Sequence, residues 1–138
     1  MKSLFNFSIC VLLLSLSMPI WAANQELDIQ LEKCLEKNAT TIGMTQCVEQ
    51  FHKKWDIELD LKLKELTKLL SKDQIKSFNE TQQRWVQYKI AEFKSIDSIY
   101  NTIEGTMYMP MRASEKMELV RERANKIASQ VGLINMTK

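Results

Sequence analysis

The chain of 138 residues predicts an all-α protein: a small, disulfide-stapled bundle of about four helices, two of them long and antiparallel. Beyond residue 22 there are only one proline and three glycines, whereas Leu, Lys, Glu and Gln, which favour helices, are abundant. Apolar residues recur there at steps of three and four, the spacing of an amphipathic helix. Two cysteines thirteen positions apart predict the staple.

The first 22 residues predict a secretory signal peptide. Lys2 is followed by an apolar run over residues 4–20 and then by small residues, with cleavage expected after Ala22. A membrane anchor would need about 20 apolar residues, and a lipoprotein would need a cysteine just after the run, whereas Cys10 lies inside it. We therefore expect export to the periplasm, with residues 23–138 forming a single domain that neither stays in the membrane nor binds a cofactor.

The first two helices are expected over residues 25–37 and 41–70, separated by a polar break that caps the second helix. On the first, the apolar face consists of Leu27, Leu31, Cys34 and Leu35. On the second, it consists of Met44, Val48, Phe51, Trp55, Leu59, Leu63, Leu66 and Leu70.

The third helix begins with a capping-box pattern, in which Ser71 and Gln74 can satisfy each other's backbone. It is expected over residues 72–103 with Gly105 as its left-handed cap, and its apolar face comprises Ile75, Phe78, Trp85, Tyr88, Phe93, Ile96, Ile99 and Ile103. A loop is expected over residues 106–112 and a last helix over 113–130, followed by a frayed tail.

Cys34 and Cys47 lie on the inner faces of the first two helices, with a short turn between them. Antiparallel helices joined in this way can bring the two Cα atoms within the roughly 4.4–6.8 Å that a disulfide requires. In an oxidising compartment an even pair favours a disulfide. Closing this loop is worth about 3 kcal/mol in the chain-entropy model.

Several short motifs follow one another in a distinctive order along residues 26–130. They are Cys34 and Cys47, then Trp55-Asp56 and Leu59, then Gln83-Arg84-Trp85-x-x-Tyr88-Lys89, then Gly105-Thr106, and finally Arg121 and Arg123-Ala124. Together they resemble the family of small secreted bacterial helical domains named after the lysozyme inhibitor LprI. The resemblance implies a protein-binding domain whose partner is a lysozyme or another peptidoglycan-cleaving enzyme, without identifying inhibitory residues.

The chain departs from the family pattern at three places. Members commonly carry arginine where this chain has Lys89, a third cysteine where it has Phe93, and a fourth near residues 114–116. Because both partners of that second bridge are absent, the resemblance implies that apolar contacts replace it.

Catalysis is not expected. His52 is the only histidine, and beside two lysines it is expected to be an exposed surface residue. Together with Asp56 it could supply two metal ligands, too few for a site. A net charge of +2 gives no reason to expect a nucleic-acid partner.

The most unusual local sequence supplies the candidate contact loop for a protein partner. Its residues are Met107, Tyr108, Met109, Met111 and Arg112. Exposed apolar side chains of this kind are typical of interaction surfaces. Three alternatives remain. The loop could be a hydrophobic lid that closes the end of the bundle, with methionines filling irregular gaps, or the three thioethers could bind Cu(I). The protein could also be an immunity protein that neutralises a toxin delivered to the periplasm.

Overall fold

The computed structural model describes residues 21–137, with side chains described from residue 25 onward. These residues form α1 (Trp21–Lys37), α2 (Thr41–Leu69), α3 (Lys72–Tyr100) and α4 (Met109–Met136), with a 3₁₀ helix, η1 (Thr106–Tyr108), before α4. Residues 21–137 contain no strand, and the all-α class is confirmed. The predicted signal sequence lies outside the described residues as far as residue 20, so its cleavage stays a prediction.

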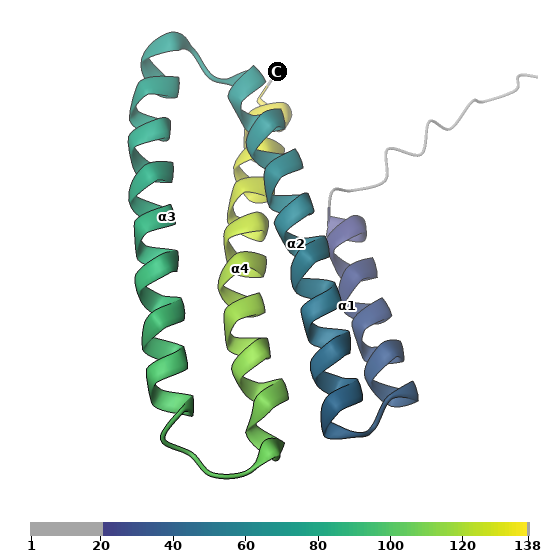
Figure 1. The fold of residues 1–138 in the computed structure, drawn as a ribbon. Coiled ribbons are helices and arrows are strands. Elements are labelled where there is room, and N and C mark those ends of the chain that lie inside the picture. The colour runs from purple at the N-terminus through teal and green to yellow at the C-terminus, as the bar shows by residue number, and fades with distance from the viewer. Residues whose placement is uncertain (1–20, 138) are drawn as a thin grey trace, which may run out of the picture.

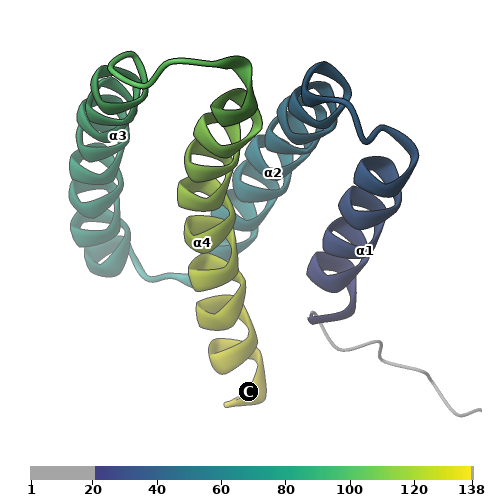
Figure 2. The same cartoon turned by 90° about the horizontal axis from the view of Figure 1, so that it is seen from below.

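Successive helices run in opposite directions, which makes α2 and α4 parallel to each other (Figure 1). These two helices lie side by side along most of their length, with α1 beside α2 and α3 beside α4 (Figures 1 and 2). The long second and third helices are antiparallel, as predicted. The most extensive helix contact is nevertheless the one between the parallel helices α2 and α4, which the sequence did not predict.

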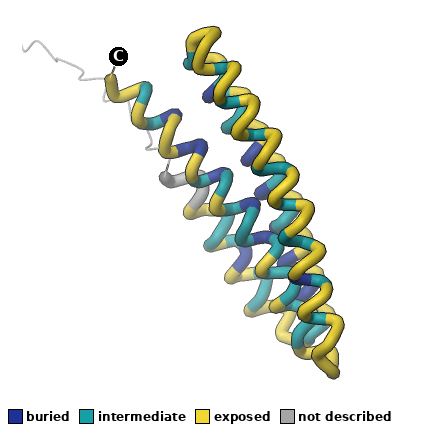
Figure 3. The backbone as a smooth tube through the Cα atoms, turned by 90° about the vertical axis from the view of Figure 1, so that its left-hand side faces the viewer, coloured by how far each residue is buried: buried dark blue, intermediate teal, exposed yellow. Residues whose placement is uncertain are grey.

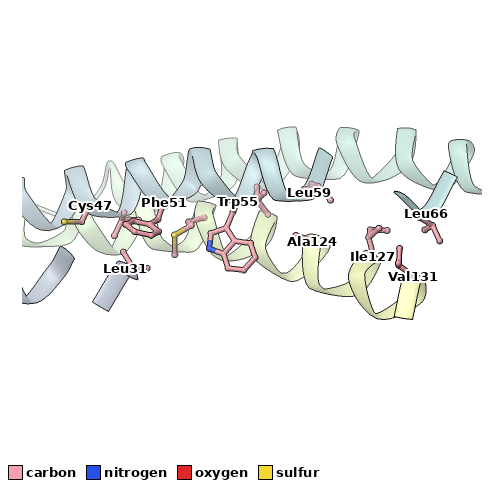
Figure 4. Close-up of a cluster of buried hydrophobic side chains, with 12 residues drawn as sticks. Leu31, Cys47, Phe51, Trp55, Leu59, Leu66, Ala124, Ile127 and Val131 are labelled. Atoms are coloured by element: carbon pink, nitrogen blue, oxygen red, sulfur yellow. The ribbon is translucent and has the colours of Figure 1, made fainter. Parts of the chain in front are cut away.

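The core lies between α2 and α4, where their buried side chains face one another (Figure 4). Trp55, at the middle of α2, is fully buried, as are Val120 and Ala124 on α4. Small side chains at a helix contact allow the two axes to come close together. The core residues are Leu31, Cys47, Val48, Phe51, Trp55, Leu59, Leu66, Met117, Val120, Ala124, Ile127 and Val131.

Two predicted caps are present. The side chain of Thr40 accepts a hydrogen bond from the backbone N–H of Gly43 at 3.0 Å and begins α2. A Cβ at position 43 would lie 2.9 Å from atoms of both Asn38 and Thr40, so this tight turn requires glycine. Ser71 and Gln74 form the capping box that begins α3.

The bounds of the last two helices differ from the prediction. The third ends at Tyr100 with Asn101 as its cap, so Gly105, at φ 98°, precedes η1 and does not cap α3. The fourth begins four residues early, because Pro110 in its first turn lacks only an N–H that would have no helical partner there. It also continues through Gly132 to Met136, since Val131 remains buried against the core.

The third helix is less buried than its apolar pattern predicted. Only Ile96 is fully buried, while Tyr88 and Ile99 are more than half exposed. Because α2 and α4 pack directly against each other, α3 covers one side of the pair and keeps much of its own surface in solvent (Figure 3). Within residues 21–137, no helix is long and apolar enough to cross a membrane.

Candidate functional site

The candidate site is the end of the bundle where α3 connects to α4, called here the tip (residues 99–112). Its most exposed apolar residues are Ile99, Ile103, Met107, Met109 and Met111, with exposures between 38% and 63%. Exposed apolar residues scattered singly on a surface need no explanation, but a group at one place marks a candidate interaction site. The structure therefore places the predicted methionines beside two isoleucines that the sequence analysis had assigned to the buried face of the third helix.

The predicted contact loop is mostly helical. Met107 and Tyr108 belong to η1, whereas Met109 and Met111 lie in the first turn of α4. Residues two apart on a helix do not face each other, so the thioethers of Met109 and Met111 diverge. This geometry does not favour a copper site made of all three methionines. It presents them as separate apolar contacts.

An ionic cluster fixes the tip to the side of the bundle. Arg112 donates from Nε to the Asp97 carboxylate at 2.7 Å, and Lys116 donates to the same oxygen. The hydrogen bond from Lys116, followed by that from Arg112, holds the pKa of the Asp97 carboxyl below its usual value. Arg112, predicted as a partner contact, is thus already engaged within the chain, although its side chain remains 40% exposed.

A second polar contact joins the two helices beside this cluster. The hydroxyl of Tyr100 donates to Oε1 of Glu115 at 2.6 Å. Hydrogen bonding to Glu115 raises the pKa of the Tyr100 phenol. Because α3 and α4 are tied on both sides of the turn, the apolar residues of the tip stand on a fixed support.

Below the tip, cations lie over aromatic rings between α3 and its neighbours. Lys89 lies between Trp85 and Phe93 along α3, with its ammonium 5.3 Å and 5.9 Å from their ring centroids. It also reaches Asp56 of α2 at 3.8 Å. Lys116 of α4 lies 5.4 Å from the centroid of Phe93. These contacts attach α3 to both central helices through polar groups as well as through apolar burial.

Phe93 occupies the position where the resemblance placed a missing cysteine, and Lys116 lies in the stretch expected to hold its partner. We expected apolar contacts to replace that bridge. Phe93 is packed against the hydrophobic core, which agrees with that expectation. The Lys116 ammonium also lies over the Phe93 ring and pairs with Asp97, a polar contact that was not expected.

His52 is not the exposed residue that its lysine neighbours suggested. Its side chain is 20% exposed, its ring meets Phe93 edge-on at 5.7 Å, and its Nε2 lies 3.8 Å from Asp56. Burial lowers the pKa of the His52 imidazole, with Asp56 acting in the opposite direction. Residues 25–137 contain no group of three or more His, Cys, Asp or Glu side chains that could hold a metal ion.

The disulfide is present between Cys34 of α1 and Cys47 of α2, with Cα atoms 5.8 Å apart. It lies beside the turn that joins these helices, where Asn38 donates to the backbone carbonyl of Cys34 at 2.8 Å. On the other side of α1, Asp28 pairs with Arg121 of α4 at 2.9 Å. The first helix is thus held at one end by a covalent bond and near its middle by an ion pair.

The cations between α3 and its neighbours were not predicted from the sequence, although part of the signal is visible there. Trp85, Lys89 and Phe93 follow one another at steps of four, which places them on one face of a helix. A lysine between two aromatic residues on an inward face indicates a cation–π contact. The matching residue on α4, Lys116, cannot be identified without knowing which helices are neighbours.

Comparison with known proteins agrees with this geometry. The family model described as lysozyme inhibitor LprI matches residues 34–127. The fold is similar to the crystal structure of an uncharacterized protein from Burkholderia thailandensis, with a TM-score of 0.74 and 27% sequence identity over 80% of this chain. The match spans 55% of that longer protein. Among proteins with curated descriptions, no sequence matches significantly. Since the family model covers well over half of the sequence, including the disulfide and the aromatic face of α3, the chain belongs to the LprI lysozyme-inhibitor family.

Proposed function

We propose that this protein is a periplasmic inhibitor that binds a lysozyme or another peptidoglycan-cleaving enzyme through its tip. Membership of the family supports protein binding as the role. The single observation that points to the tip is the group of exposed apolar residues on a support fixed by Asp97 and Tyr100. Interfaces bind most strongly through a few apolar anchors that are already ordered before binding.

The composition of the tip suits a partner with an apolar cleft. The connection between α3 and α4 lies at one end of the bundle (Figure 1), and its methionines are flexible enough to fill an irregular apolar surface. Inserted into the sugar-binding cleft of a hydrolase, such an end would exclude the glycan strand. Inhibition would then be competitive with the cell-wall substrate.

Charge provides little of the proposed affinity. The whole chain carries a formal charge of only +2, and Arg112 and Lys116 at the tip are neutralised in part by Asp97. Charge complementarity mainly accelerates association and makes it sensitive to salt. We therefore expect apolar contact to be the main contribution to affinity. Binding to a basic lysozyme should then change little with ionic strength.

The test measures whether the protein inhibits cell-wall hydrolysis by each enzyme of a panel. The panel contains lysozymes of different classes and bacterial lytic enzymes. At least one enzyme should be inhibited, and Met107→Asp with Met111→Asp should abolish that inhibition. The matched control is Ile57→Asp with Leu61→Asp, two apolar residues of α2 that are just as exposed but lie outside the tip. Equal loss in both double variants, or no inhibition of any enzyme, would contradict the proposal.

An immunity protein against a periplasm-acting toxin would use the same kind of surface on a different partner. The two roles can be separated by adding secreted toxins that cleave peptidoglycan to the enzyme panel. Inhibition confined to such a toxin would assign immunity and would still place contact at the tip. Export is tested separately, since the protein recovered from the periplasm should begin at Ala23.

A further inference from the structure

A second candidate site lies at the opposite end of the bundle from the tip. There the turn between α2 and α3 lies near the C-terminal part of α4 (Figure 1), and an open groove of about 380 Å³ lies among the three helices. This volume is within the range of about 300–1,000 Å³ that is typical of small-molecule sites. The groove touches neither the ionic cluster nor the exposed methionines.

Five of the ten residues that line this groove are apolar, and only one is charged. Its apolar residues are Leu66, Leu70, Phe78, Leu133 and Ile134. The remaining lining residues are neutral amides and hydroxyls, except for Arg123. None of the lining residues is acidic. The groove therefore combines an apolar surface with a single positive charge.

The environment of Arg123 is unusual for an arginine. Its guanidinium donates two hydrogen bonds to the neutral Oε1 of Gln82, at 2.8 and 3.2 Å, and lies 5.6 Å from the centroid of the Trp85 ring. Within residues 25–137, no carboxylate forms an ion pair with it. By contrast, Arg121 on the same helix pairs with both Asp28 and Glu118.

The half-burial of Arg123 is energetically unfavourable without a counter-charge. Desolvation lowers the pKa of its guanidinium, and no neighbouring carboxylate acts against this effect. Removing a charge from water costs free energy unless an opposite charge or enough hydrogen bonds compensate. A carboxylate bound beside Arg123 would supply that compensation through charge-assisted hydrogen bonds.

The positions of the lining residues give the approximate length of the groove. Arg123 lies near the middle of α4, and Ile134 lies eleven residues further along, close to its end. At 1.5 Å per residue the groove extends roughly 16 Å along this helix. One end is charged, and apolar residues continue along the rest among neutral polar side chains, which corresponds to an extended alkyl chain with an anionic head.

We propose that this groove binds an alkyl carboxylate, a free fatty acid of medium length, with its carboxylate at Arg123 and its chain along Leu66, Phe78 and Leu133. Each methylene of the chain that leaves water contributes to binding. The site is separate from the tip, so the proposal does not depend on inhibition of a hydrolase.

Calorimetric titration of the purified exported protein with dodecanoate, below the concentration at which it forms micelles, tests the proposal. Dodecanoate should bind at one site, at least about tenfold more tightly than the uncharged dodecanol, a factor within the range of a charge-assisted hydrogen bond. Arg123→Gln should remove that preference. The matched control is Lys126→Gln, which removes an exposed charge from the same helix outside the groove.

A second pair of variants tests the apolar part without disturbing the core. Leu133 and Met136 are both exposed apolar residues near the end of α4, but only Leu133 lines the groove. Leu133→Glu should weaken dodecanoate binding at least tenfold, whereas Met136→Glu should leave it unchanged. Absence of saturable binding, equal affinity for dodecanol, or equal losses in Lys126→Gln and Arg123→Gln would each overturn the proposal.

Discussion

Two helices flank the central pair of α2 and α4, and they are held to it by different means. The shorter, α1, is joined to α2 by a disulfide and to α4 by the ion pair between Asp28 and Arg121. The longer, α3, has no disulfide to either neighbour. It is held by cations of α4 over its aromatic rings, by the pair between Lys89 and Asp56 of α2, and by the cluster around Asp97. Both helices use α4 as a support.

The difference follows from length and burial. Isolated helices shorter than about 12–15 residues are marginal in water. With 17 residues α1 is only slightly longer, and among its residues 25–37 only Leu31 is buried in the core. The covalent bond therefore compensates for a small apolar contact. By contrast, α3 extends over 29 residues and distributes its attachment over many weaker contacts. Its polar contacts concentrate near the tip, where the proposed function requires a fixed surface.

The largest expected effect is a difference in stability between a variant of the central helix α2 and a variant of the flanking helix α3. Trp55 is fully buried between α2 and α4, so Trp55→Ala should lower the free energy of unfolding by about 3–5 kcal/mol. Trp85 of α3 is only partly buried at the edge of the same core, so Trp85→Ala should cost clearly less. Chemical denaturation of both variants checks the order. Equal costs would show that α3 belongs to the core as fully as α2.

Removal of the disulfide should have the next largest effect. The double variant Cys34→Ser, Cys47→Ser should lose about 3 kcal/mol in the chain-entropy model. Hydrogen exchange should rise first along α1, because Asp28 alone then holds this helix to α4. If exchange rose equally along α3, the two flanking helices would not be attached independently.

Loss of the ionic cluster should have a smaller and more local effect. Asp97→Asn removes the charge shared by Arg112 and Lys116, and partly exposed pairs of this kind contribute about 0.2–1 kcal/mol. Exchange should increase over residues 97–112 without change along α1. The folded pKa of Asp97 is lowered, so this contribution is complete above about pH 4, the unfolded value, and is lost as pH falls through the folded pKa. Between pH 6 and pH 3, the free energy of unfolding should fall less in Asp97→Asn than in the natural protein, as chemical denaturation would show.

The smallest effect concerns His52, which lies between α2 and α3. Its folded pKa is lowered, so the folded state favours the neutral ring and stability should fall as pH drops below about 6.5. Burial dominates over Asp56 and Glu49, which favour the charged form, while Lys89 and Lys116 oppose it. His52→Gln should reduce the difference in thermal midpoint between pH 7.5 and pH 5.5. An unchanged difference would indicate that other groups cause it.

Features encoded locally could be predicted from the sequence. The bounds of α2 agree within one residue, and the capping box at Ser71 and the Cys34–Cys47 disulfide are both present. Each depends on residues close together in the chain and on a repeat that sets one helix face. The family assignment likewise depended on the order of short motifs, and it is confirmed by the family model.

Features that depend on the relative placement of helices could not be predicted. Periodicity identifies the inner face of a helix but not the helix that covers it, so the parallel contact of α2 with α4 was missed. For the same reason the sequence could not show that Arg123 donates to the neutral Gln82 or that Lys116 pairs with Asp97, because both partners lie on α3. At the tip a loop was expected over residues 106–112, whereas Pro110 lies in the first turn of α4, a place where proline is common.

Hydrogen exchange with and without a bound enzyme would show whether the fixed apolar tip is the contact surface. The protein should be measured free and saturated with a peptidoglycan-cleaving enzyme that it inhibits. Protection on binding should concentrate over residues 99–112, with α1 and the outer face of α2 unchanged. Protection centred on α1, or on the outer face of α2 around Ile57 and Leu61 with the tip unaffected, would contradict it.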